Sequence, residues 1–155
     1  MEEQGSFVGR QGQGVDLPPE SPRSPRGTEF HKLLRGLAKL DRVRGGLIVA
    51  PDGFVIASDL PQGIAVEPLA ALAATLGREL EVGAARLKRG AFQMALFSAD
   101  DGTVFLGASP VGFLVVLGDR DVNLGLIRVE LRRAMDAVQE AWGTSRPSAQ
   151  GIGPP

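Results

Sequence analysis

The chain has 155 residues, a length that suits one domain of ordinary size. Apolar residues make up 43% and charged residues 23%, which is typical of globular proteins, and the formal net charge of −1 indicates neither a nucleic-acid nor an anionic-membrane partner. The absence of cysteine excludes disulfides, thiolate metal sites and a cysteine nucleophile. No apolar stretch resembles a signal peptide or a membrane span, so we expect a cytoplasmic protein.

The two ends of the chain differ in composition from its middle. Residues 1–27 and 143–155 together hold 8 of the 21 glycines and 7 of the 11 prolines, and neither segment shows helical or strand periodicity. Such segments bury too little apolar surface to offset chain entropy, so we expect both to be disordered tails. One ordered domain is predicted between them, over residues 28–142.

The first predicted element is an amphipathic helix. Thr28 is of the residue type preferred at the N-cap, and the apolar side chains that follow recur at three- and four-residue spacing, at Phe30, Leu33, Leu34, Leu37 and Leu40. The Gly45-Gly46 pair is expected to end this segment.

A hairpin follows in the stretch VRGGLIVAPDGFVIASDLP (Val43–Pro61). Leu47–Ala50 and Phe54–Ala57 are two short apolar runs, and Asp52-Gly53 between them is a strong turn signal. A hairpin with one face in water alternates apolar and polar residues, so these uninterrupted runs predict strands that are covered on both faces.

The rest of the domain reads as a helix, three strands and a final helix. Val66–Leu87 has the longest helical pattern, and Asp100-Asp101-Gly102 is a second hairpin turn. The last helix is capped by Asp121 or Asn123, and its apolar stripe runs through Leu124, Ile127, Leu131, Ala134, Val138 and Trp142. The strands are predicted over Ala91–Ser98, Thr103–Ala108 and Phe113–Leu117.

The predicted order is therefore α-β-β-α-β-β-β-α, and the tight turns indicate a five-stranded antiparallel sheet. Leu47–Ala50 and Phe113–Leu117 are apolar throughout, so they are expected to be the central pair. The first and last helices then cover one face and the middle helix covers the other, which gives a three-layer α/β/α domain.

The middle helix carries more apolar surface than one sheet needs. A stripe of Leu69, Leu72, Ala73, Leu76, Leu80, Gly83, Ala84 and Leu87 suffices to cover the sheet, yet small apolar residues continue around the helix. A helix that is apolar all round is buried all round, so we predict a homodimer. The alternative is that alanine simply raises helix propensity on an exposed face.

Two segments are predicted to form the dimer interface. Small residues of the middle helix would let two copies approach closely, and the uncharged segment at 92–96 is expected to be an edge strand that pairs with its own copy. The predicted interface residues are Ala71, Ala74, Gly77, Ala85, Phe92, Gln93, Met94, Ala95 and Leu96.

Two stretches resemble the roadblock/dynein light chain family, in particular its bacterial gliding-motility type. RGGLIVAPDGFVIASDLP (Arg44–Pro61) is similar to the family's opening hairpin, and GDRDVNLGLIRVELRRA (Gly118–Ala134) to its final turn and helix. The resemblance implies a roadblock-like, profilin-like fold and a homodimer with its sheets joined edge to edge. It also implies a small Ras-like GTPase as partner, whose GTP hydrolysis a roadblock dimer activates in the gliding-motility pair.

The partner is expected to bind across the paired middle helices, at Thr75, Arg78, Glu81 and Val82. No catalytic, metal or cofactor residues are predicted: the sequence has no P-loop, and His31 is its only histidine. The chain is therefore predicted to be a non-enzymatic adaptor or regulator. A PAS-like or profilin-like small-molecule sensor, and a dimerisation scaffold without a GTPase partner, remain as alternatives.

Overall fold

The computed structural model describes residues 25–144. Helices and strands follow one another in the predicted order, α-β-β-α-β-β-β-α. The elements are α2 (Pro25–Ala38), β1 (Val43–Val49), β2 (Val55–Asp59), α3 (Val66–Arg86), β3 (Met94–Ala99), β4 (Gly102–Ser109), β5 (Gly112–Gly118) and α4 (Leu124–Thr144).

The five strands form one antiparallel sheet in the order β2-β1-β5-β4-β3. Strands β1 and β5 lie side by side, with Leu47 opposite Val115, which confirms the predicted central pair. Within residues 25–144, strand β3 pairs only with β4 and lies at the edge, as its position after the middle helix predicted.

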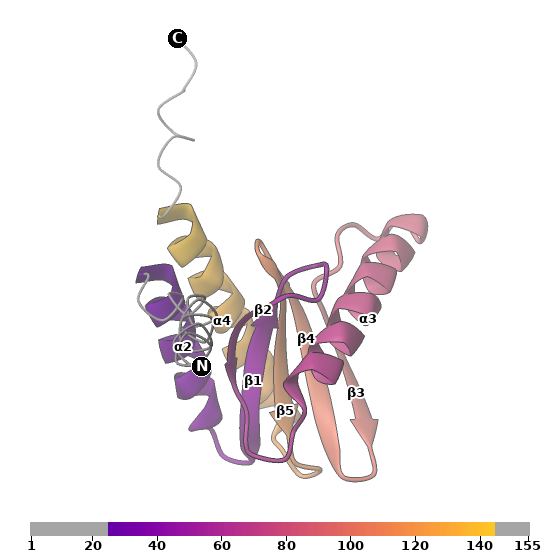
Figure 1. Ribbon diagram of the computed structural model, residues 1–155. Coiled ribbons are helices and arrows are strands. Elements are labelled where there is room, and N and C mark those ends of the chain that lie inside the picture. Colours follow the sequence, from indigo (N-terminus) through magenta and orange to yellow (C-terminus); the bar gives the residue numbers. More distant parts are fainter. Residues whose placement is uncertain (1–24, 145–155) are drawn as a thin grey trace, which may run out of the picture.

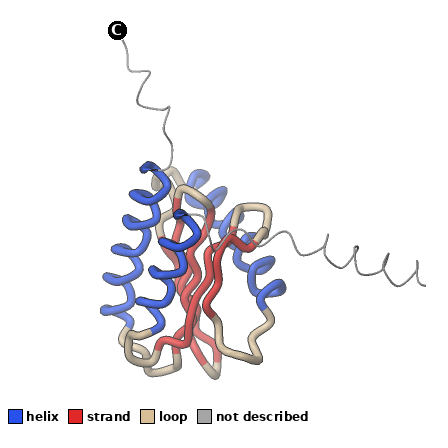
Figure 2. Tube along the Cα trace, turned by 60° about the vertical axis from the view of Figure 1, so that its left-hand side comes forward, coloured by secondary structure: helices blue, strands red, loops and turns tan. Residues whose placement is uncertain are grey.

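Helices α2 and α4 cover one face of the sheet and α3 covers the other, as Figures 1 and 2 show. Under α2 and α4 the core is built from buried side chains such as Phe30, Leu34 and Ile127 against Ile48 and Leu114. Under α3 a smaller core gathers Leu47, Val49, Ala70, Ala73, Leu106, Phe113 and Val115. The uninterrupted apolar runs of β1 and β5 therefore have a physical reason, because both faces of these strands are buried.

Strand β1 begins at Val43 rather than at the predicted Leu47, and Gly45-Gly46 lie inside it. Gly45 has a φ of 148°, and a Cβ there would collide with the carbonyl oxygen of Asp59 in β2. A Cβ on Gly46 would collide with the carbonyl oxygen of Val115 in β5. The two glycines therefore let neighbouring backbones approach closely, and do not mark a break.

The terminal helices are longer than predicted. Helix α2 begins at Pro25 instead of Thr28, and α4 continues through Gly143 to Thr144. Proline is well tolerated in the first turn of a helix, where its missing N–H has no helical partner. The remainder of the two predicted tails, residues 1–24 and 145–155, lies outside the described residues.

One predicted turn and one predicted helix cap are confirmed in their local geometry. Gly53, with a φ of 95°, donates its N–H to the carbonyl of Ala50 at 2.9 Å and closes the first hairpin. At the start of α4, the N–H of Leu126 donates to Oδ1 of Asn123 at 2.9 Å. Asn123, and not Asp121, is therefore the N-cap.

Candidate functional site

Helix α3 rests on the sheet through its smallest side chains. Ala70, Ala73, Ala74 and Gly77 are buried, and a Cβ on Gly77 would collide with the ring of Phe113 on β5. This contact brings the helix axis close to the sheet and fixes the rotation of the helix about its axis.

Because of this rotation, part of the apolar stripe predicted to cover the sheet faces elsewhere. Leu72 and Leu87 were expected to cover the sheet, but they are 47% and 73% exposed. Two predicted interface residues are corrected as well, because Ala74 and Gly77 are buried within the protomer against its own sheet. Neither has surface to offer a second copy.

The exposed surface of α3 has two distinct flanks. A Cβ on Gly53 would lie 4.0 Å from the Cα of Ala71, and Nη1 of Arg78 donates to the carbonyl oxygen of Pro51, so both residues face the β1–β2 turn. At about 100° per residue, Leu72 and Leu76 point to the opposite flank, toward β3. Ala71 and Ala85 are exposed, but Ala71 lies on the flank away from the edge strand.

The edge strand itself is largely uncovered. Of the predicted interface residues near it, Phe92, Met94 and Ala95 are half-buried, whereas Gln93 and Leu96 are exposed. Phe97 is 41% exposed and lies opposite Val104, which places it on the α3 face of the sheet. Leu96 lies opposite Phe105 and so points to the face of α2 and α4.

An apolar surface therefore runs from α3 to the edge strand. We name the set Leu72, Leu76, Phe92 and Phe97 the α3–β3 surface. Helical periodicity predicted Leu72 on the stripe that covers the sheet, and Phe97 was not among the predicted interface residues. Alternation along β3 was the available signal, since residues 95 and 97 of one strand must share a face.

The predicted partner-binding residues lie on the outer surface of α3. Thr75, Arg78, Glu81 and Val82 are all exposed. Beside them, the β1–β2 turn presents Phe54, which is 70% exposed, and the Arg78–Pro51 hydrogen bond ties this turn to the helix. The structure thus brings together one aromatic, one aliphatic and two charged side chains, a mixture suited to protein recognition.

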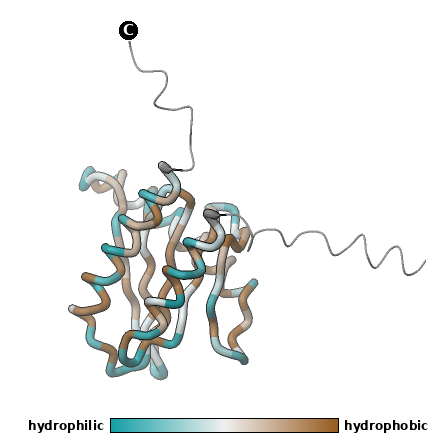
Figure 3. The backbone as a smooth tube through the Cα atoms, turned by 90° about the vertical axis from the view of Figure 1, so that its left-hand side faces the viewer, coloured by the Kyte–Doolittle hydropathy of each residue, from teal (hydrophilic) through white to brown (hydrophobic). Residues whose placement is uncertain are grey.

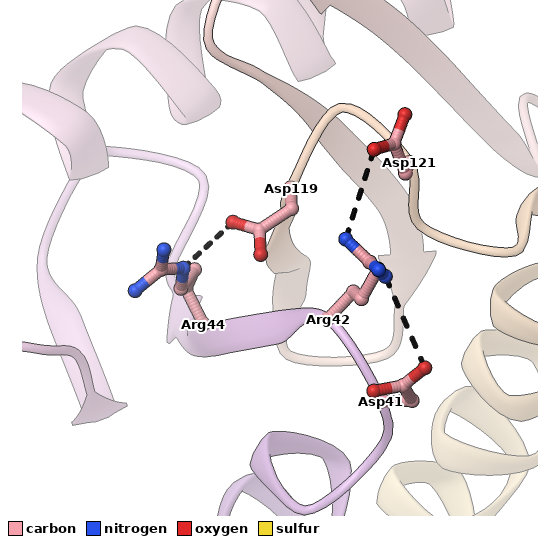
Figure 4. Close-up of polar contacts among 5 residues, drawn as sticks. All are labelled: Asp41, Arg42, Arg44, Asp119 and Asp121. Carbon is pink, nitrogen blue, oxygen red and sulfur yellow. Dashed lines mark hydrogen bonds and ion pairs between the residues drawn. The ribbon is translucent and has the colours of Figure 1, made fainter.

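A cluster of charged residues joins the loops before β1 and after β5 (Figure 4). Nε of Arg44 donates to Oδ1 of Asp119 at 2.7 Å, and Nη1 of Arg42 lies 3.7 Å from Oδ2 of Asp121. The hydrogen bond to Asp119, and then the charge of that carboxylate, raise the pKa of Arg44. Because the pairs are largely exposed and the backbone N–H of Asp119 also donates to the carbonyl of Arg42, the cluster positions two loops and is not a reactive centre.

A hollow beside this cluster measures about 700 Å³ and lies on the α3 side of the sheet. Val104 and Leu117 contribute to it from the sheet, and the turns around Gln62 and Asp101 border it. Within residues 25–144, no group of three or more histidine, aspartate or glutamate side chains is arranged to hold a metal ion. The same range contains no helix with the length and hydropathy required to cross a membrane.

Comparison with known proteins gives both a family and a set of structural relatives. The model of the Roadblock/LC7 domain matches residues 29–118. Uncharacterized protein MJ0310 of Methanocaldococcus jannaschii is 34% identical over 108 residues, which cover 70% of this chain and 95% of that protein. The family match therefore spans most of α2, the whole of α3 and the whole sheet.

Solved structures that share the fold include two MglB proteins. MglB of Myxococcus xanthus superposes with a TM-score of 0.71 at 21% identity, covering 76% of this chain and 90% of that one. The gliding protein MglB of Thermus thermophilus gives a TM-score of 0.67 at 20% identity, with coverages of 76% and 91%. The family match over residues 29–118 agrees with the sheet order and with the placement of the three described helices, and this chain therefore belongs to the Roadblock/LC7 domain family.

Proposed function

We propose that the protein is a non-enzymatic, cytoplasmic homodimer that binds a small Ras-like GTPase and acts as its regulator or adaptor. Membership of the Roadblock/LC7 family supports this proposal, since the family resemblance implies such a partner. The single observation that carries it is the α3–β3 surface, an exposed apolar flank beside an uncharged edge strand.

The unpaired outer edge of β3 supports the proposed homodimer. Strand β3 has no neighbour on its outer side among the described residues, and its six residues include neither charge nor proline. An open edge of this kind pairs readily with another strand, and an antiparallel copy of β3 supplies one. The same pairing would place both α3 helices on one face of the joined sheet, with Leu72 and Phe97 on the side of the partner. A stable interface of this type buries about 1,200–2,000 Å² in total.

The GTPase is expected on the outer side of the paired α3 helices. Thr75, Arg78, Glu81 and Val82 are exposed there, Arg78 lies on the flank that meets the β1–β2 turn, and Phe54 extends the surface toward this turn. The sequence has no P-loop, so we assign nucleotide binding to the partner. A regulator without catalytic groups acts by binding one conformation of the GTPase more tightly than another, which shifts their populations.

Two measurements test the proposal. Light scattering should give a mass twice that of the 16.3 kDa chain. Affinity capture with purified Ras-like GTPases of the same genome, loaded with GDP or a GTP analogue, should retain one of them in a nucleotide-dependent way. A monomer at high micromolar concentration contradicts the homodimer. A dimer that captures no GTPase in either state favours the scaffold alternative.

The sensor alternative has less support from the structure. The 700 Å³ hollow contains four charged residues, but two of these, Arg44 and Asp119, already bond to each other. A ligand site usually offers converging polar groups that await a partner.

A further inference from the structure

Opposite charges stand at the two ends of strand β3, which itself carries none. Arg86, Lys88 and Arg89 precede the strand, at the end of α3 and in the loop after it, whereas Asp100 and Asp101 form the turn that follows. All five side chains are exposed. The two segments lie at opposite ends of the molecule in Figure 1, and Figure 3, which is coloured by hydropathy, shows hydrophilic residues in the loops at both ends. We name Arg86, Lys88 and Arg89 the cationic end of β3, and Asp100 and Asp101 its anionic end.

No partner within the protomer neutralises these charges. None of the five side chains forms an ion pair or a hydrogen bond with another residue of the described range, 25–144. The two ends cannot pair with each other, because the six residues of β3 span about 20 Å, more than twice the Debye length of about 8 Å at physiological ionic strength. The protomer therefore presents two uncompensated patches of opposite sign at the ends of an open, apolar edge.

Neighbouring charges leave this contrast in place. Beside the anionic end, Arg44 and Asp119 bond to each other and together contribute no net charge. At the start of β3, helix α4 lines two hollows with Arg128, Arg132 and Asp136, and these two cations and one anion add one positive charge in sum. The strand thus begins in positive surroundings and ends in negative ones.

The proposed homodimer, on which this inference rests, brings opposite ends together. In an antiparallel pair, residues that lie opposite each other point to the same face, so a two-fold axis perpendicular to the sheet must pass at one residue of β3 and its copy. An axis at Leu96 sets Asp100 opposite the partner's Phe92, and an axis at Phe97 sets it opposite the partner's Met94. In both registers the anionic end of each protomer lies beside the loop that joins α3 to β3 in the other.

We propose that the charged ends of β3 select a second copy of this chain, in antiparallel orientation, as the partner of this edge. Each anionic end then lies near a cationic end, and the dimer holds two such sets related by symmetry. An uncharged strand of another protein gains nothing from these charges, and a parallel copy sets like charges side by side. The apolar residues of the α3–β3 surface supply the affinity, and the ends of β3 supply the specificity.

Charge exchange tests the proposal, with self-association of the full chain measured by sedimentation equilibrium in a buffer of low ionic strength. Lys88→Glu/Arg89→Glu and Asp100→Lys/Asp101→Lys should each raise the dimer dissociation constant about tenfold or more, because two-fold symmetry counts every reversal twice. An equimolar mixture of these two variants should regain the association of the unchanged protein as a heterodimer, since each reversed end then meets its complement.

The matched control is Lys32→Glu/Arg35→Glu, which reverses one exposed lysine and one exposed arginine on α2, the helix that covers β1 and β2. This variant should dimerise as the unchanged protein does. Its mixture with Asp100→Lys/Asp101→Lys should not restore the association that the latter has lost, which separates a local match of charges from attraction between oppositely charged molecules.

Three results overturn the charge selection and leave the homodimer standing: unaltered dissociation constants in both double variants, no recovery in their mixture, or equal effects of the control. A monomeric mass of the unchanged protein refutes the homodimer and the charge selection together. If far-ultraviolet circular dichroism shows that a double variant does not fold, the milder pair Arg89→Glu and Asp101→Lys repeats the exchange.

Discussion

The backbone of Gly77 on α3 lies directly against the ring of Phe113 on β5. This single contact decides which side of the middle helix faces the sheet. It also means that a side chain at residue 77 would collide with this ring.

Gly77→Ala should therefore destabilise the fold, although alanine favours helices by about 1 kcal/mol over glycine. The added methyl group must displace Phe113 or lift the helix, and overpacking of this kind costs about 1–3 kcal/mol. Urea unfolding measures the difference. Gly36→Ala in α2 is the control, since a Cβ there meets nothing within 4 Å and should leave stability unchanged or slightly raised. Equal effects at both positions would show that the ring does not constrain the helix.

The α3–β3 surface predicts where charge breaks the dimer. Leu72→Glu and Phe97→Glu should each lower the measured mass toward that of one chain, because an unpaired carboxylate in an apolar interface is costly. Val129→Glu, an equally drastic change at an exposed position of α4, should leave the mass unaltered. Ala74→Glu is unsuitable for this purpose, because a charge at this buried position would disrupt the protomer itself. Dimers of unchanged mass in both test variants would place the interface elsewhere.

The outer surface of α3 predicts a variant that loses the GTPase and keeps the dimer. Val82→Glu should reduce capture of the partner at least tenfold, with light scattering unchanged, since truncated or reversed contacts at the centre of an interface cost about 2 kcal/mol or more. Val129→Glu again serves as the comparison. If Val82→Glu binds normally, the partner must use another face of the molecule.

The cap of α4 gives a prediction about stability alone. Asn123→Ala should lower the free energy of unfolding by about 1 kcal/mol, because it removes the acceptor for the N–H of Leu126. Asn123→Asp should retain most of the stability. Asp121→Ala, which removes only a 3.7 Å ion pair with Arg42, should cost less than Asn123→Ala in the same thermal or urea assay.

Two glycines of the sheet should respond very differently to alanine. At Gly112, with a φ of 146°, a Cβ would collide with the carbonyl oxygen of Val49, and neither backbone has room to move. At Gly107 the obstacle is the end of the flexible Met135 side chain. Gly112→Ala should cost about 2 kcal/mol or more, and clearly more than Gly107→Ala, in urea unfolding. The reverse order would contradict this assignment of the two contacts.

Much of the architecture was predictable because local and global signals agree. The run Phe113–Leu117 is apolar on both faces and lies at the centre of the sheet, and the position of β3 after the middle helix predicted an edge. The Gly45-Gly46 pair was read wrongly, because a sequence does not show whether glycine serves a turn or a close approach between strands.

The rotation of α3 was not predictable. A helix with apolar residues nearly all round offers several faces that suit a sheet, and only the bulk of Phe113 on a distant strand selects the one with Gly77. For the same reason Ala74 and Gly77 were assigned to an interface, while the exposed Leu72 was assigned to the core. The residue types predicted that α3 packs on the sheet, but not which side of α3 stays exposed to solvent.

Strand β3 has one further consequence for the living cell. Most natural sheets protect a free edge with lysine, proline or a bulge, and Met94–Ala99 has neither lysine nor proline. With the proposed homodimer, closure of this edge obeys mass action. At low concentration the chain is monomeric, and the edge of β3 can pair with other extended polypeptides. At high concentration it pairs with its own copy. The cellular concentration of the chain would then decide how much of it is dimeric and protected from aggregation. A short peptide that binds the edge of β3 would block the dimer.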